Sequence, residues 1–180
     1  MILLVGGASC AGKTCFAQRL LERYHIPYLS IDHLKMGLIR GWKDCGSTAL
    51  SDDAVIDARL WPVLQGIVET ALENGQSLVM EGCYLPQREV RTLLERYPAQ
   101  IQALYLVLSE GYLRRHFSDG LLAHRDDIER RLTPEARDMA AVIGENRAQR
   151  ALCQRWGLPY LEVQEDYGAE IEAALERFDR

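Results

Sequence analysis

The amino-acid sequence predicts an α/β protein with a five-stranded parallel sheet and helices on both faces. Short apolar segments suited to buried strands alternate with longer segments in which apolar residues recur at helical spacing. The first apolar segment, residues 2–5, runs directly into a glycine-rich loop, and a helical segment follows that loop. This order of strand, loop and helix indicates that the chain begins with a parallel β-α unit.

The loop after the first strand carries a phosphate-binding motif, Gly7-Ala8-Ser9-Cys10-Ala11-Gly12-Lys13-Thr14. In this pattern the backbone N–H groups and the N-terminus of the next helix bind phosphate oxygens. The lysine reaches the β- and γ-phosphates, and the hydroxyl binds Mg²⁺. We therefore predict a P-loop NTPase fold in which Lys13 is catalytic, Thr14 binds the metal, and the nucleotide is held by Gly7, Ala8, Ser9, Cys10, Ala11, Gly12, Lys13, Thr14 and Cys15. The alternative is a glycine-rich turn that binds nothing.

The first half of the chain alternates strands and helices up to residue 75. We expect a helix over 13–24, a second strand over 26–31, a short helix over 33–39 and a loop over 41–47. Ser51 to Asp53 should cap a long helix that ends at Asn74-Gly75. Because Pro62 falls inside this helix, we expect a kink or a division there.

The second half continues the alternation. Residues 76–82 and 101–108 predict the third and fourth strands, with a helix over 87–97 between them, and residues 158–163 predict the fifth strand. Thr133-Pro134-Glu135 should start a helix that runs to Trp156, and residues 169–178 predict a closing amphipathic helix. The chain then forms one domain over residues 1–180, with an acceptor-binding insertion at about 33–62 and a lid at about 112–138.

Composition and charge are those of an ordinary globular protein. The chain has 180 residues, 48% of them apolar and 26% charged, with a net charge of −5. The acidic balance disfavours non-specific nucleic-acid binding, and no apolar run approaches the length of a membrane span. Five cysteines without a C-x-x-C pair indicate reduced thiols in a cytoplasmic protein.

Two carboxylates at predicted strand ends are candidates for substrate chemistry. Asp32 follows the second strand, where it can accept a proton from an acceptor hydroxyl or orient that hydroxyl. The alternative is an N-cap for the helix over 33–39. Glu81 ends the third strand, where it can act on Mg²⁺ through water or contact the acceptor. The alternative is a strand-end carboxylate that pairs with an arginine.

Arginines supply the remaining candidates. Arg114 and Arg115 open an arginine-rich segment that can close as a lid and stabilise the transferred phosphoryl group, with Arg147 as a later lid arginine. Mixed-charge helices are otherwise solvated faces with i,i+4 ion pairs. Arg59 can reach a pocket formed by Asp32 and Glu81, where it would favour an acidic acceptor. The alternative is a surface arginine.

The chain resembles the small P-loop kinases, which include nucleoside and nucleotide kinases, shikimate and gluconate kinases, antibiotic phosphotransferases and zeta-toxin-like kinases. The matching pieces are GASCAGKT after the first strand, SID ending the second, MEG ending the third, RR opening the lid and YLEV as the final strand. The SIDHLKMG segment also has a likeness to 2-phosphoglycerate-kinase-like proteins. Ser30 stands where shikimate kinases have the first Asp of D-x-D, and their glycine triplet after the third strand is absent.

The resemblance implies the strand order 2-3-1-4-5, ATP and Mg²⁺ as cosubstrates, and an adenine site near Gln164, Glu165 and Asp166. We predict an ATP- and Mg²⁺-dependent kinase that phosphorylates a hydroxyl group of a small metabolite. Two alternatives stay open at this point, a nucleotide-binding switch without an acceptor and a kinase that acts on nucleic-acid ends. GTP is disfavoured as the nucleotide because the chain lacks the N-K-x-D motif of GTPases. The sequence names no acceptor and no oligomeric state.

Overall fold

A five-stranded parallel sheet forms the centre of the protein in the computed structural model, which describes residues 1–42, 44–48, 51–117 and 138–178. The strands are β1 (Ile2–Gly7), β2 (Tyr28–Ser30), β3 (Leu78–Glu81), β4 (Ile101–Leu108) and β5 (Tyr160–Val163). Their order is β2-β3-β1-β4-β5, and every pairing is parallel. The predicted fold class and strand order are therefore confirmed.

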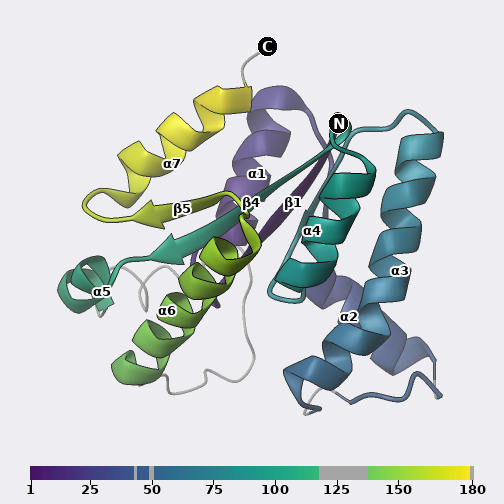
Figure 1. The fold of residues 1–180 in the computed structure, drawn as a ribbon, viewed down its shortest axis with the longest axis horizontal. Coiled ribbons are helices and arrows are strands. Elements are labelled where there is room, and N and C mark those ends of the chain that lie inside the picture. The colour runs from purple at the N-terminus through teal and green to yellow at the C-terminus, as the bar shows by residue number, and fades with distance from the viewer. Residues whose placement is uncertain (43, 49–50, 118–137, 179–180) are drawn as a thin grey trace.

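Helices cover both faces of the sheet (Figure 1). One face carries α1 (Lys13–Tyr24) and α7 (Tyr167–Leu175), and the other carries α3 (Asp53–Glu73) and α4 (Gln87–Arg96). The helix α6 (Met139–Trp156) packs beside α4 and along β4. The shorter helices α2 (Ile31–Gly41) and α5 (Glu110–His116) follow the carboxyl ends of β2 and β4, and a 3₁₀ turn, η2 (Glu176–Phe178), follows α7.

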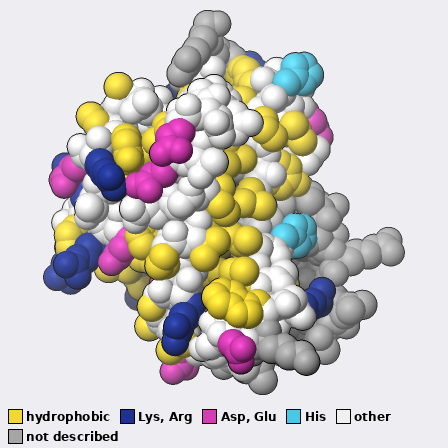
Figure 2. Space-filling view, turned by 90° about the vertical axis from the view of Figure 1, so that its right-hand side faces the viewer, with side chains coloured by type: hydrophobic (Ala, Val, Ile, Leu, Met, Phe, Trp, Pro, Cys, Tyr) yellow, Lys and Arg dark blue, Asp and Glu magenta, His cyan; other side chains and the backbone are white. Residues whose placement is uncertain are grey.

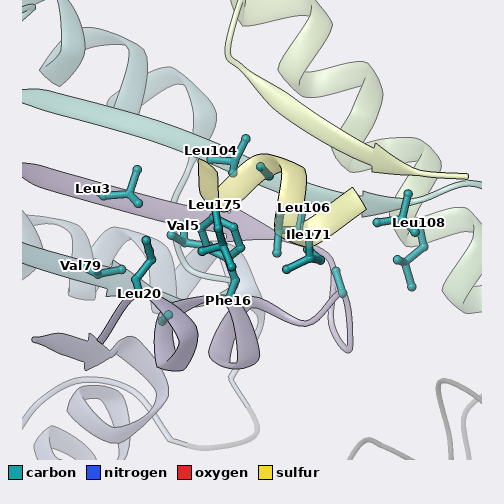
Figure 3. Packing of buried hydrophobic residues seen from close by; sticks show 14 of the residues in the cluster. Leu3, Val5, Phe16, Leu20, Val79, Leu104, Leu106, Leu108, Ile171 and Leu175 are labelled. Atoms are coloured by element: carbon teal, nitrogen blue, oxygen red, sulfur yellow. The ribbon is translucent and has the colours of Figure 1, made fainter. Parts of the chain in front are cut away.

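The central strand β1 divides the core into two layers. Leu3 and Val5 face α1 and α7, whereas Ile2 and Leu4 face α3 and α4, as expected from the alternation of side chains along a strand. Figure 3 shows the first layer, in which Phe16 of α1 and Ile171 and Leu175 of α7 lie over strand residues, among them Leu104 and Leu106 of β4. Because β1 is buried on both faces, all of its residues are apolar or glycine.

The strand register sets the ends of β2 and β3 level with each other and with Val5, two residues before the end of β1. Glu81 of β3 is paired with Val5 of β1 on one side and with Ser30 of β2 on the other. On the far side of β1, Gly7 is paired with Leu106 of β4. In sheets of this kind ligands bind outside the carboxyl ends of the strands. The phosphate-binding motif and the two candidate carboxylates are therefore at the same edge.

Several boundaries differ from the sequence prediction. The strands β2, β3 and β5 are shorter than expected, and α2 begins at Ile31, so Ser30 rather than Asp32 stands at the N-cap position. The alternative interpretation of Asp32, as the N-cap of this helix, is therefore wrong. The short edge strand ends once its pairing with Glu81 is made, and the chain turns at once into the helix. The expected helix start at 133–135 lies outside the described residues.

Pro62 does not divide the long helix, which is continuous over Asp53–Glu73. A proline within a helix leaves the carbonyl of the residue four positions earlier without its N–H donor. Here that residue is Ala58, and both Ala58 and Pro62 are exposed, so the carbonyl can be hydrated. The expected division therefore does not occur, whereas the predicted end is confirmed by Asn74 at the C-cap and by Gly75 at φ +63°.

The surface on the α3 side carries a band of apolar side chains between charged ones (Figure 2). Trp42 and Val55 are the large apolar side chains left exposed in the described part of the chain, at 57% and 43%. Both lie in the segment 33–62, where the sequence predicts the acceptor site. Among the same described residues, no helix combines the length and apolarity that a bilayer crossing requires.

A buried asparagine joins α6 to the end of β4. The Asn146 side chain is 2% exposed, and its Oδ1 accepts a hydrogen bond from the backbone N–H of Leu108 at 2.7 Å. Its Nδ2 donates to the carbonyl of Val142 at 2.9 Å. The last residue of β4 thus has its N–H satisfied by a helix side chain instead of a strand. This contact attaches α6 to the last residue of β4, two residues before α5 begins.

We expect Asn146→Leu to destabilise the protein, because the buried N–H of Leu108 would lose its acceptor. A buried donor without a partner costs about 1–3 kcal/mol, and urea denaturation followed by circular dichroism would measure the loss. The matched control is Gly144→Ala in the same helix, where an added methyl group meets no atom within 4 Å. That control should raise stability by about 0.5–1 kcal/mol. An unchanged midpoint for Asn146→Leu would contradict the structural role of this side chain.

Candidate functional site

The phosphate-binding loop lies between the end of β1 and the start of α1, and two of its glycines have no room for a side chain. A Cβ on Gly7, which has φ +132°, would lie 2.1 Å from the carbonyl oxygen of Leu106. A Cβ on Gly12, which has φ +86°, would lie 1.7 Å from the hydroxyl of Tyr167. Both positions therefore require glycine for conformation and for space. The loop is held against β4 on one side and against the start of α7 on the other.

Lys13 is buried at the first position of α1, with 7% of its surface exposed. Its ammonium group donates a hydrogen bond to the carbonyl of Ala8 at 2.7 Å, so the side chain folds back across the loop. A buried ammonium beside loop N–H groups and a helix N-terminus is a strongly positive site. The chemistry of this donor set fits the anionic phosphates of a nucleotide.

Thr14 and Glu81 form the second contact of the site. The Thr14 hydroxyl donates to Oε2 of Glu81 at 3.2 Å, and Glu81 is 2% exposed. A hydroxyl and a carboxylate are hard oxygen ligands of the kind that Mg²⁺ takes, usually together with water and substrate phosphates. The pair lies directly beside the phosphate-binding loop. These residues therefore fit Mg²⁺, with Thr14 as a direct ligand and Glu81 next to it.

Tyr167 makes a hydrogen bond to the phosphate-binding loop. Its hydroxyl donates to the carbonyl of Gly12 at 3.3 Å, and burial raises the pKa of this phenol well above its usual range. The phenol therefore stays protonated and remains a donor at physiological pH. Because Tyr167 is the first residue of α7, this contact brings the β5–α7 connection next to the phosphate-binding loop.

The β5–α7 connection, residues 164–166, is ordered by one carboxylate. Glu170 accepts hydrogen bonds from the backbone N–H groups of Gln164, Glu165 and Asp166 at 2.9–3.2 Å. Burial would raise the pKa of Glu170, but these three N–H groups lower it below its ordinary value. The segment that the sequence predicts near the adenine thus has a fixed conformation.

Asp32 lies in the first turn of α2, where it makes an ion pair with Lys35. The Lys35 Nζ is 2.9 Å from Oδ1 of Asp32 and donates to the Tyr84 hydroxyl at 2.8 Å. Asp32 is 38% exposed and Lys35 is 12% exposed, so the carboxylate is the outer member of the pair. The structure therefore holds Asp32 at the carboxyl edge with one oxygen engaged.

The Arg59 guanidinium lies beside Gly46 in the structure. Arg59 is exposed on α3, and its guanidinium lies 3.0 Å from the place where a Cβ on Gly46 would stand. Among the described residues it makes no hydrogen bond or ion pair with Asp32 or Glu81. Its assignment to substrate binding stays a prediction.

The arginines of α5 are engaged in ion pairs. Arg114 pairs with Glu110 at 2.7 Å, and Arg147 of α6 pairs with the same carboxylate. Hydrogen bonds from Arg114 and Arg147 lower the pKa of Glu110. Arg115 donates to the carbonyl of Gln164 at 2.6 Å and pairs with Glu165 at 3.3 Å. Residues 118–137 of the expected lid lie outside the described residues, so the catalytic role of Arg114 and Arg115 stays a prediction.

Sequence reasoning missed Lys35, Tyr84 and Tyr167. The i,i+3 spacing of Asp32 and Lys35 is a sequence signal that could have identified the first of them. Tyr84 and Tyr167 carry no such signal, because their partners are 49 and 155 residues away along the chain. Their contacts exist only once the sheet is assembled.

Comparison with known proteins gives a family and a set of structural relatives. A family model described as an AAA domain matches residues 1–119, which is more than half of the chain. No curated protein sequence matches the chain.

Solved structures of similar fold include shikimate kinase from Bacteroides thetaiotaomicron, with 14% identity and a TM-score of 0.63 over 100% of this chain and 99% of that one. Shikimate kinase from Acinetobacter baumannii in complex with shikimate has 18% identity and a TM-score of 0.59 over 99% and 90% of the two chains. A sugar kinase from Janibacter sp. HTCC2649 has 18% identity and a TM-score of 0.56 over 99% and 94%. With the sheet order and the phosphate-binding loop described above, the matches show that the chain belongs to the AAA domain family and has the fold of the small P-loop kinases.

Proposed function

We propose that this protein transfers the γ-phosphoryl group of ATP to a hydroxyl group of a small metabolite. The observation that supports the proposal is the contact between Thr14 and the buried Glu81 beside Lys13, because a hydroxyl, a carboxylate and an ammonium then lie together at the phosphate-binding loop. Phosphoryl transfer needs mainly such positioning and charge neutralisation. A cytoplasmic, reducing location belongs to the same proposal.

The residues of the loop have distinct roles in this proposal. The N–H groups of residues 7–15 bind the phosphates, and Lys13 releases Ala8 to neutralise charge on the β- and γ-phosphates. Thr14 would hold Mg²⁺, which would supply positive charge to offset that of the phosphates. Glu81 accepts a hydrogen bond from Thr14, as in this structure, or from water at the metal. The Gln164–Asp166 segment forms the adenine side of the site.

Asp32 acts on the acceptor. The acceptor hydroxyl oxygen forms a bond to the γ-phosphorus, the bond from that phosphorus to the leaving oxygen of ADP breaks, and Asp32 takes the hydroxyl proton. Its partly exposed carboxylate at the end of β2 supports this role. The relatives described as shikimate and sugar kinases support a small polyhydroxylated acceptor. The arginines of α5 are the candidates for stabilising the transferred group.

We expect one class of acceptor to stimulate ADP formation from ATP and Mg²⁺. The test panel is glucose, gluconate, shikimate, uridine and kanamycin, which represent sugars, sugar acids, cyclic hydroxy acids, nucleosides and amino alcohols. Lys13→Ala should reduce the stimulated rate by about 10²–10³-fold or more, since it removes a charged donor to the transferred group. Tight ATP binding with no stimulation by any compound would favour a nucleotide-binding switch instead.

Asp32→Asn should lower acceptor-stimulated kcat by about 10²–10⁴-fold, the range associated with loss of a general base. ATP affinity should be retained, because Asp32 does not contact the phosphate-binding loop in the structure; calorimetric titration with ATP would show this. The matched control is Glu73→Gln, which neutralises an exposed carboxylate at the far end of α3. Full activity in Asp32→Asn would remove the residue from the mechanism.

Glu81→Gln should increase the Mg²⁺ concentration needed for half-maximal activity by about 10–100-fold, as expected for loss of a carboxylate that orients a metal ligand. The measurement is ADP formation over a Mg²⁺ titration at saturating ATP. Glu95→Gln, which removes the charge of an exposed carboxylate on α4, is the control. An identical Mg²⁺ dependence in the Glu81 variant would exclude its action at the metal.

A further inference from the structure

We propose that Lys35 is a positioning residue which, held by Tyr84, fixes the Asp32 carboxylate relative to the phosphate-binding loop. The inference rests on the proposed function, in which Asp32 acts on the acceptor hydroxyl. It concerns a lysine and a tyrosine to which no role in the site has been given above. Lys35 and Tyr84 come from different elements, and three sets of contacts support their joint role.

The first set joins Lys35 to both partners. Lys35 Nζ lies 2.9 Å from Oδ1 of Asp32 and 2.8 Å from the Tyr84 hydroxyl, and it also lies 4.4 Å from the centroid of the Tyr84 ring. The ammonium is thus held by a carboxylate, a hydroxyl and an aromatic face. Within the described residues the Asp32 carboxylate has no other partner. Its second oxygen therefore stays available for an acceptor hydroxyl.

The second set fixes the loop that carries Tyr84. This loop, residues 82–86, joins β3 to α4. The Tyr105 hydroxyl donates to the carbonyl of Leu85 at 2.8 Å, and the Tyr105 ring lies so close to Gly6 that a Cβ there would be 2.3 Å away. Gly82 lies close to Ile31, at the start of α2. Tyr84 therefore lies in a loop that is held by contacts with β4 and with the start of α2.

The third contact links the same loop to the phosphate-binding loop. The Ser9 Oγ and the Cys83 Sγ are 3.7 Å apart, within hydrogen-bonding distance for sulfur. Cys83 and Tyr84 are adjacent, so the loop contacts the phosphate-binding loop through one residue and Lys35 through the next. This chain of contacts relates the position of Asp32 to that of the phosphate-binding loop.

The burial of the pair indicates which member faces the acceptor. Lys35 is 12% exposed and Asp32 is 38% exposed, so the ammonium lies inside and the carboxylate outside. Burial would lower the pKa of Lys35, but Tyr84 and Asp32 raise it above its ordinary value, and the side chain remains a cation at neutral pH. A buried cation that is paired with the more exposed Asp32 is placed to orient that carboxylate, not to bind the acceptor itself.

Titration of Lys35 tests the contact without any acceptor. The chain contains only three lysines, Lys13, Lys35 and Lys43, so selective lysine labelling gives few NMR signals, and Lys35→Arg identifies the one that belongs to Lys35. We expect the pKa of Lys35 to fall in both Asp32→Asn and Tyr84→Phe. Tyr97→Phe, a substitution at a half-buried tyrosine at the end of α4, should leave it unchanged. The same Lys35 pKa in the wild-type protein, Asp32→Asn and Tyr84→Phe would overturn the proposal.

Kinetics test whether Lys35 acts through Asp32. With the most effective compound of the acceptor panel, Lys35→Met should lower kcat by about 10–100-fold, the size of effect expected from misplacing a reacting group, and should leave the KM for ATP unchanged. The double variant with Asp32→Asn should be no slower than Asp32→Asn alone, and Lys35→Arg should recover part of the rate. If the fold reduction in kcat of the double variant equals the product of the reductions in the two single variants, the proposal is overturned.

Failure of the proposed function and failure of the role proposed for Lys35 give different results. A wild-type chain that no panel compound stimulates would refute the proposed function, and the titration would then decide the Lys35 contact by itself. A stimulated wild-type chain with multiplying losses would keep the function and refute the role of Lys35. If Lys35→Met does not fold, as judged by circular dichroism and ATP binding, Tyr84→Phe takes its place in the kinetic cycle.

Discussion

The candidate site depends on the position of β3 between β1 and β2 in the sheet. Parallel pairing on both sides sets Glu81 level with Val5 and with Ser30. The buried carboxylate is then directed at Thr14, and the chain leaving β2 is directed at the same edge. A shift of one residue in this register would turn Glu81 to the other face of the sheet. The metal-binding and acceptor-binding parts of the proposed site therefore share one determinant.

The β3–α4 loop, residues 82–86, joins these two parts. It contacts the phosphate-binding loop through Cys83, the first turns of α2 through Tyr84, and β4 through the carbonyl of Leu85. A loop with contacts on three sides loses little further freedom when substrate binds, which favours a preorganised site. The contacts of this loop therefore set the position of Asp32 relative to the phosphate-binding loop within the protein itself.

Arg114 makes an exposed i,i+4 pair of the kind found on solvated helix faces, whereas Arg115 contacts the β5–α7 segment. Arg115 reaches the Gln164 carbonyl and Glu165 on the β5–α7 segment, while Arg114 and Arg147 share Glu110. These exposed ion pairs are individually weak and exchangeable. The contacts of Arg115 join α5 to the segment that Glu170 orders beside Tyr167, which is the proposed adenine side of the site.

The sequence by itself determined the α/β class, the place of the phosphate-binding loop and the roles open to Lys13 and Thr14, because a local pattern of residues encodes the backbone path of that loop. It also placed β4 correctly, since a long apolar segment between polar turns is unambiguous. The tertiary structure alone decided that Glu81 meets Thr14, that Tyr84 holds Lys35 against Asp32, and that Arg59 lies beside Gly46. The i,i+3 spacing of Asp32 and Lys35 is a local pattern that is compatible with their ion pair. The contacts of Tyr84 and Tyr167 with their distant partners follow from strand register and helix packing, which no local pattern specifies.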